Sequence, residues 1–121
     1  MSYHHDWLMS QIEAITATLI YLLTGERTPA AVVDQFEHTR SDTNRLHLKL
    51  QLLVSQGLIC QAENALFAAM DDHDPEVPEA AARFYAEINR LSDAQLQDAN
   101  FSREEILSGL DLVCKTYGLQ M

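Results

Sequence analysis

Few side chains in this 121-residue chain have the types and spacing that catalysis requires. Glu104 and Glu105 form a carboxylate pair, but adjacent residues on a helix point about 100° apart and do not converge on one substrate. Capping of a helix that starts near Ser102 explains them better, because acidic side chains stabilise helix N-termini. The sequence also lacks a phosphate-binding glycine loop and a His-Glu-x-x-His motif. We therefore expect no catalytic residues and no cofactor.

Two segments contain residue types that bind metals. His4 and His5 stand before Asp6, but adjacent histidines at a chain end seldom bind a metal. The segment from Asp71 to Glu79 (DDHDPEVPE) holds five acidic residues, yet it lacks the ligand spacing and the glycine of a calcium loop. We interpret it as a solvated acidic linker and predict no metal site.

Three polar residues leave a second function open. His38, His47 and Tyr85 could serve a pocket between helices, because helical bundles host sites of that kind. The chain would then be a small enzyme or a ligand-binding sensor. A single histidine is more often a surface or capping residue, so this hypothesis is the alternative.

The composition limits the possible partners. The chain has 18 acidic and 8 basic residues, a net charge of −10, which disfavours nucleic acids and anionic membrane surfaces. Its apolar content of 47% predicts one packed domain over residues 1–121. We see no signal peptide and no membrane span, and we expect Cys60 and Cys114 to be buried reduced thiols of a cytoplasmic protein.

Helical periodicity predicts an all-α fold, a compact array of about six to seven helices with antiparallel hairpins. The organising element is Leu46–Met70, which we interpret as two helices joined by a turn at Gly57. Leu48 and Leu52 lie opposite the main apolar face of the first of these helices, so we expect neighbours on both sides of it. The hairpin resembles one unit of the tetratricopeptide-repeat class through Leu50, Leu53, Gly57, Ala62 and Ala65.

Capping signals mark the other helices. The first runs from about Asp6 to Thr24, and Thr28-Pro29 begins a second that reaches about His38. Either Ser41 or Asp42 caps the third helix. The later starts are Pro78, Ser92-Asp93, and a capping box of Ser102 with Glu105 for a last helix that ends at Gly118. The residues expected to be largely buried are Leu50, Leu53, Ala62, Leu66, Phe84, Ile88, Ile106, Leu110 and Val113.

The first helix has more apolar residues than one neighbour can cover. Its main seam consists of Leu8, Ile12, Ile15, Leu19 and Leu22. Other large side chains lie outside the seam, namely Trp7, Met9, Ile20, Tyr21 and Leu23. We predict that they form an interaction surface and that the protein is a homodimer. Near the other end, Arg103 is expected to belong to a surface patch that contacts an acidic partner. The leading function is a non-catalytic adaptor that binds a protein segment or its own copy.

Three stretches together resemble a family of short bacterial proteins classed as a domain of unknown function. They are DWLMSQIEAITATLIYLL, GLICQAENALFAAM and FYAEINRLSDAQLQDANFSREEILSGLDLVCKTYG. The most specific parts are Ala62-Glu63-Asn64, Leu91-Ser92-Asp93 and the run from Asn100 to Ile106. The resemblance implies a compact helical fold in a bacterial cytoplasm. It implies no activity, cofactor or site residue.

Overall fold

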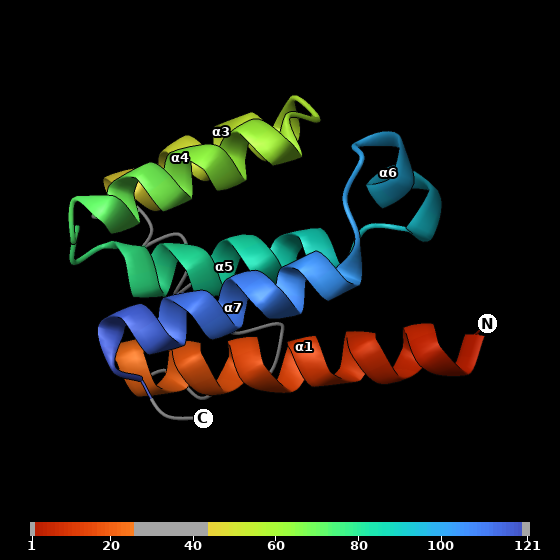
Figure 1. Cartoon of the computed structure of the whole chain (residues 1–121), viewed down its shortest axis with the longest axis horizontal. Coiled ribbons are helices and arrows are strands. Elements are labelled where there is room, and N and C mark those ends of the chain that lie inside the picture. The colour runs from red at the N-terminus through yellow and green to blue at the C-terminus, as the bar shows by residue number, and fades with distance from the viewer. Residues whose placement is uncertain (1, 26–43, 120–121) are drawn as a thin grey trace.

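The computed structural model describes residues 2–25 and 44–119, and these residues form six α-helices and no strand (Figure 1). The helices are α1 (Ser2–Thr24), α3 (Arg45–Ser55), α4 (Ile59–Asp71), α5 (Val77–Asn89), α6 (Asp93–Asp98) and α7 (Arg103–Tyr117). The all-α prediction is confirmed. The expected helix from Thr28 to His38 lies outside the described residues, as do Ser41 and Asp42.

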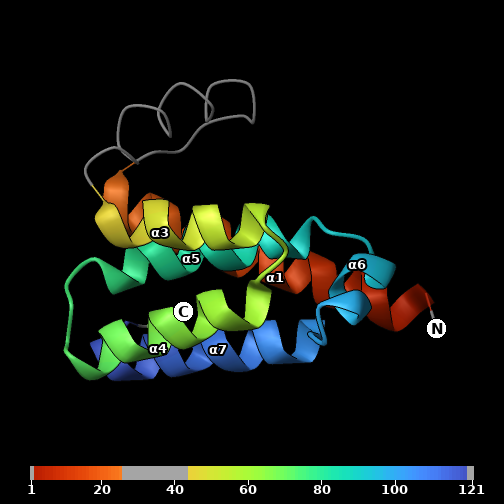
Figure 2. The same cartoon turned by 90° about the horizontal axis from the view of Figure 1, so that it is seen from above.

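The centre of the fold is α5, whereas the sequence had suggested the hairpin Leu46–Met70. This helix packs against α1, α3, α4 and α7, and its longest contact is with α1 (Figures 1 and 2). Ten of its thirteen residues are buried. Ala80, Ala81 and Ala82 are all fully buried, because short side chains let neighbouring helices approach α5 from several directions. Phe84, Tyr85 and Ile88 fill the remaining space around it.

Helix α3 begins after Asn44, so neither Ser41 nor Asp42 is its cap. The Asn44 side chain accepts a hydrogen bond from the His47 backbone N–H at 2.8 Å and donates one to the Glu76 carbonyl at 3.3 Å. The Glu76 carboxylate in turn accepts from the Leu46 N–H at 3.0 Å. Asparagine is as good a cap as serine or aspartate, and here it also ties the start of α3 to the start of α5.

The hairpin of α3 and α4 turns at Gly57, as predicted. Gly57 has φ of +77°, a left-handed conformation that glycine adopts without steric cost. Figure 2 shows the two helices running in opposite directions, with α3 beside α5. Leu48 and Leu52 are exposed, 39% and 60%, so the second apolar side of α3 is not covered as we had expected.

The other helix boundaries follow the sequence signals closely, except that α1 begins at Ser2, four residues before the expected start at Asp6. Pro78 lies in the first turn of α5, and Gly118 ends α7 with φ of +67°. Ser102 caps α7 by accepting from the Glu105 N–H at 3.2 Å. The two-way capping box belongs instead to α6, where Ser92 and Gln95 bond to each other's backbone at 3.1 and 2.9 Å.

Nearly all of the expected core residues are buried. The exception is Leu53, which is half-buried at the edge of the core. Both cysteines are free, and Cys114 is buried as expected, with a thiol pKa raised by its burial. Cys60 is exposed, contrary to our expectation, because the side of α4 that bears it faces solvent near the Ala99 carbonyl, to which its thiol donates at 3.3 Å.

Candidate functional site

Helix α1 has an inner face that packs on the core. Leu8, Ile12 and Leu19 are at most 3% exposed, and they face α5 and α7. Thr16 also lies on this face, and its hydroxyl donates to the Ile12 carbonyl at 2.8 Å, so no polar group there is left without a bond. The inner face thus holds α1 in one orientation and determines which residues point outward.

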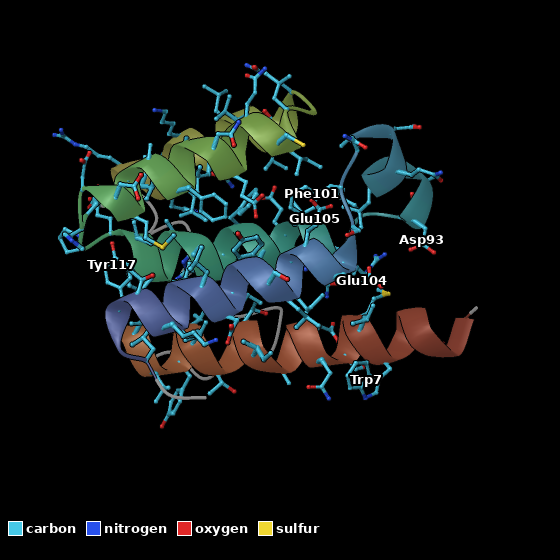
Figure 3. The ribbon with its side chains drawn as sticks, in the orientation of Figure 1. Trp7, Asp93, Phe101, Glu104, Glu105 and Tyr117 are labelled. Carbon is cyan, nitrogen blue, oxygen red and sulfur yellow. The ribbon has the colours of Figure 1, made fainter. Side chains whose placement is uncertain are left out.

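The opposite side of α1 carries a line of exposed residues that we call the outer stripe. It consists of Trp7, Ser10, Ala14, Ala17 and Tyr21, all exposed. Trp7 is 56% and Tyr21 is 42% exposed, and Figure 3 shows Trp7 on the side of α1 away from α7. Small, uncharged residues separate the two aromatic rings. The outer stripe is therefore flat in the middle and apolar at both ends.

The stripe contains no ionisable group except the Tyr21 phenol. Between residues 6 and 24, the carboxylates of Asp6 and Glu13 are the only formal charges. Both lie on one flank of the stripe, and Glu13 neighbours it directly, three residues after Ser10 and four before Ala17. The stripe itself is uncharged, but acidic side chains border it on one side.

The predicted interaction residues divide into three groups. Trp7 and Tyr21 lie on the stripe, and Leu23 is 37% exposed at the end of α1. Met9 and Ile20 are half-buried, and Ile20 packs against the core. Ser10, Ala14 and Ala17 are not among the predicted residues, although the seven-residue spacing of Trp7, Ala14 and Tyr21 indicates that they lie on one side of the helix.

Leu22 was wrongly assigned to the buried seam. It is 58% exposed, whereas Leu8 at the other end of the seam is buried. A straight helix rotates about 20° per seven residues relative to a 3.5-residue repeat, so Leu22 lies about 40° away from Leu8. That rotation takes it past the edge of α5 and onto the flank of the outer stripe.

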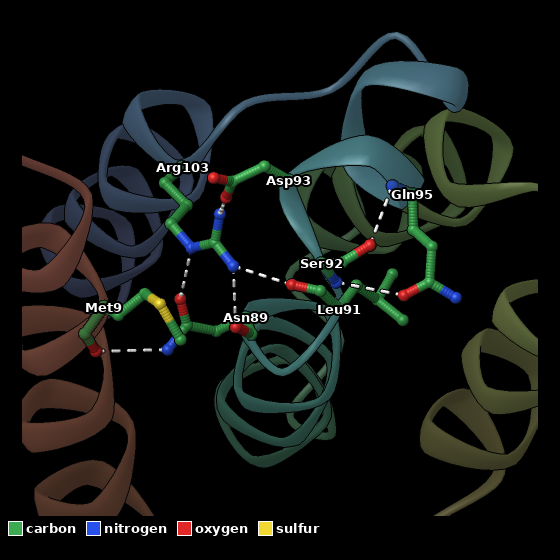
Figure 4. A network of polar contacts seen from close by, with 7 residues as sticks. All are labelled: Met9, Asn89, Leu91, Ser92, Asp93, Gln95 and Arg103. Carbon is green, nitrogen blue, oxygen red and sulfur yellow. Dashed lines mark hydrogen bonds and ion pairs between the residues drawn. The ribbon is translucent and has the colours of Figure 1, made fainter. Parts of the chain in front are cut away.

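Arg103 is buried, not part of a surface patch. It is 4% exposed, and its guanidinium is shared between α5 and α6 (Figure 4). Its Nε donates to Oδ1 of Asn89 at 3.3 Å, and its Nη2 donates to the carbonyls of Asn89 at 3.2 Å and Leu91 at 2.7 Å. Its Nη1 forms an ion pair with Asp93. The planar fork of arginine suits such a set of acceptors, which lysine cannot match.

The Arg103 cluster also positions α1. Asn89 uses its side-chain oxygen for Arg103 and its Nδ2 for the Met9 carbonyl of α1, at 3.1 Å (Figure 4). Met9 lies one turn before Glu13 and two residues after Trp7, so this bond anchors the start of α1 next to the outer stripe. Arg103 thus supports the stripe from beneath instead of contacting a partner.

A second buried polar contact joins α4 to α5. The Tyr85 hydroxyl donates to Oε2 of Glu63 at 2.7 Å, beside Gly109 of α7. Partial burial raises the pKa of the Glu63 carboxyl, and the Tyr85 bond opposes that rise. Burial and the neighbouring Glu63 carboxylate raise the pKa of the Tyr85 phenol, which stays protonated.

The residues proposed for an internal pocket do not meet. His47 is 5% exposed, and its pKa is lowered by burial and by Arg83. Arg83 and Tyr85 are two residues apart on α5, so their side chains point to opposite sides of that helix. His47 therefore lies on one side of α5 and Tyr85 on the other, while His38 lies outside the described residues.

A shallow hollow of about 380 Å³ lies between α6 and the start of α7. Its walls include Asp93, Phe101, Arg103, Glu104 and Glu105 (Figure 3 labels all but Arg103). It is acidic and open, and it contains neither His47 nor Tyr85. Within residues 2–25 and 44–119, no three His, Cys, Asp or Glu side chains are grouped as metal ligands.

Helix α1 has one further property. From Asp6 to Thr24 it is long and apolar enough to cross a membrane, judged by length and composition alone. A core helix of a soluble protein passes the same test, and the inner face of α1 does pack on α5 and α7. Its leucines and isoleucines, none of which belongs to the outer stripe, bring this helix to that threshold.

The comparisons with other proteins give a family and no function. No curated protein and no solved structure matches the chain. A family model described as a family of unknown function (DUF6483) matches residues 2–118, nearly the whole chain. The resemblance to the tetratricopeptide-repeat class gains no support from this match. The chain belongs to this family of unknown function, DUF6483.

Proposed function

We propose that this protein is a non-catalytic helical module that binds protein through the outer stripe of α1. The observation that carries the proposal is the exposed uncharged face itself, with Trp7 and Tyr21 at its two ends. Aromatic rings of this kind are enriched at protein interfaces, whereas charged residues are depleted from interface cores. The flat centre of Ser10, Ala14 and Ala17 would let a partner helix approach closely.

The charge of the chain supports a protein partner over other classes. A net charge of −10 opposes binding to nucleic acids, whose phosphates need Lys or Arg. It likewise opposes attraction to an anionic membrane surface. We propose a cytoplasmic location, which the two free thiols of Cys60 and Cys114 favour.

The alternative function, an enzyme or a ligand sensor, has weaker support. It needs polar groups that converge on one cavity, and His47 and Tyr85 lie on opposite sides of α5. The hollow between α6 and α7 has acidic walls but no grouped metal ligands among the described residues. No specific observation favours this function over protein binding.

The test is capture of bound proteins from the native cell extract with three baits. Ala14→Glu places a charge at the centre of the stripe and keeps a good helix former. Ala68→Glu is the matched control, since Ala68 is exposed on α4, far along the chain from the stripe. We expect wild type and Ala68→Glu to retain the same proteins, and Ala14→Glu to lose them. An identical set on all three baits would refute the proposed surface.

A further inference from the structure

Helix α6 lies apart from the packed helices. Figures 1 and 2 show it at the end of the molecule where α7 begins. It has no extensive contact with any other helix that the structure describes, whereas α1, α3, α4 and α7 all pack on α5. Of its six residues only Leu96 is buried. We call residues 92–101, which contain α6 and connect the end of α5 to α7, the strap.

The strap has few contacts that attach it to the core. Leu96 and Phe101 are 2% and 6% exposed, and both belong to the hydrophobic core. The Cys60 thiol of α4 donates to the Ala99 carbonyl at 3.3 Å, but a thiol is a weak donor. Ten of the thirteen residues of α5 are buried, so the strap is held by far less apolar surface than a core helix.

The ion pair of Arg103 with Asp93 is the polar attachment of the strap (Figure 4). Arg103 also donates to Asn89 of α5 and to the carbonyl of Leu91, the residue after which the strap begins. These bonds keep the guanidinium in place when Asp93 moves away. The Asp93 side chain is 60% exposed, so salt ions reach this end of the pair and weaken it.

We propose that the strap opens as a unit while the other described helices stay folded, and that the Arg103–Asp93 pair is a salt-sensitive latch that holds it closed. Opening exposes Leu96 and Phe101, which are buried in the closed form. It also removes one wall of the hollow between α6 and α7, because Asp93, Leu96 and Phe101 line that hollow. Ionic strength thus controls how much apolar surface this end of the protein presents.

Hydrogen exchange, measured by NMR for single residues, tests whether the strap opens separately. The backbone N–H groups of Leu96, Ala99 and Phe101 donate within the strap, so their exchange reports its opening. Amides in the middle of α7 report unfolding of the core. We expect the strap amides to exchange faster than the core amides. Small additions of urea should hardly change the strap rates, because a local opening exposes little surface, but should speed core exchange strongly.

Three variants test the latch in low and in high salt. Asp93→Asn removes the ion pair and should speed strap exchange about tenfold, near the value of one hydrogen bond to a charged group, and abolish its salt dependence. Asp98→Asn is the matched control, because it removes an exposed carboxylate at the other end of α6 and should do neither. Leu96→Ala weakens the apolar attachment instead, so it should speed exchange and keep the salt dependence.

Exchange at the start of α1 distinguishes the latch from a general loosening of the fold. Arg103 stays on Asn89 in the Asp93→Asn protein, and Asn89 donates to the Met9 carbonyl, so exchange there should not change. Faster exchange at the start of α1 in that variant would overturn a separate strap. The same conclusion would follow if the strap amides had the rates and the urea dependence of the core. Equal salt dependence in wild type and Asp93→Asn would overturn the latch.

Discussion

The Tyr85 hydroxyl reaches Glu63 through the space where a side chain at residue 109 would lie. Its oxygen is 2.7 Å from Oε2 of Glu63, and it would be 2.0 Å from a β-carbon built on Gly109. The glycine inside α7 is thus explained by the close approach of a phenol from α5. Three helices depend on this one contact, since Glu63 belongs to α4.

Gly109→Ala should destabilise the protein, although alanine is the better helix residue by about 1 kcal/mol. The added methyl group would displace the Tyr85 ring, and we expect a net loss of about 1–3 kcal/mol in the free energy of unfolding. Urea unfolding measures this loss. In a Tyr85→Phe background the loss should be smaller but not zero, because the ring carbon that bears the hydroxyl is also only 2.5 Å from that position. A Gly109→Ala protein as stable as wild type would show that the helices are farther apart.

Glu63 should make the protein less stable as the pH rises. Its carboxyl pKa is raised above 4.5 by burial, and Glu105 adds to the rise. The folded state therefore holds its proton more tightly than the unfolded state, and that stabilisation is lost as the pH rises from 4.5 through the raised pKa. Glu63→Gln keeps an acceptor for Tyr85 and removes the titration. Urea midpoints across this range should fall more steeply for wild type than for the variant; parallel curves would count against the assignment.

His47 should make the protein less stable as the pH falls. Burial, with a contribution from Arg83, lowers its pKa below 6.5. The folded state therefore favours neutral His47, and the stability present above pH 6.5 is lost as the pH falls through the lowered pKa. His47→Gln should flatten this part of the stability curve. Equal slopes for wild type and His47→Gln would place the titration elsewhere.

Arg103→Lys should be costly even though it keeps the charge. A lysine can reach only part of the acceptor set formed by Asn89, Leu91 and Asp93, so buried carbonyl groups would lose their partners. We expect a loss of about 1–3 kcal/mol in unfolding free energy, the range for buried groups left without a hydrogen bond. Arg90→Lys at an exposed position is the control and should change little. Hydrogen exchange should also quicken at the start of α1, because Asn89 holds the Met9 carbonyl. Unchanged exchange there would separate the cluster from α1.

The sequence predicted the helices well where local signals decide them. Gly57, Pro78, Ser92 and Gly118 each act through their own backbone or an adjacent cap, so their roles follow from residue type. Local sequence signals do not show which helix lies at the centre of the fold. Ala80, Ala81 and Ala82 of α5 are short enough for any position, and only the packing of four other helices around α5 shows that they are core residues.

The burial of Arg103 could not be predicted from the sequence. An arginine in the first turn of a helix normally lies in water, and the sequence offers no sign that Asn89 and Leu91 present their carbonyls to it. The outer stripe could have been found, because Trp7, Ala14 and Tyr21 keep a seven-residue spacing. We predicted that Met9 and Ile20 belong to the interaction surface because their side chains are large and apolar. Whether such residues are exposed or buried depends on where α5 lies.

Three leucines on α3 provide a graded test of the packing. Leu50 is 1% exposed, Leu53 is half-buried and Leu52 is 60% exposed, so the same substitution samples three environments on one helix. Leu50→Ala should cost about 2–5 kcal/mol of unfolding free energy, the usual range for a leucine whose removal leaves a cavity. Leu53→Ala should cost less, because part of its side chain is already in water. Leu52→Ala should stay within about 0.5 kcal/mol of wild type, the range of surface substitutions. Because alanine has the same helix propensity at all three sites, any difference reports burial alone. If Leu52→Ala were as costly as Leu50→Ala, the exposed side of α3 would have to be covered in solution, either by another part of the chain or by a second molecule.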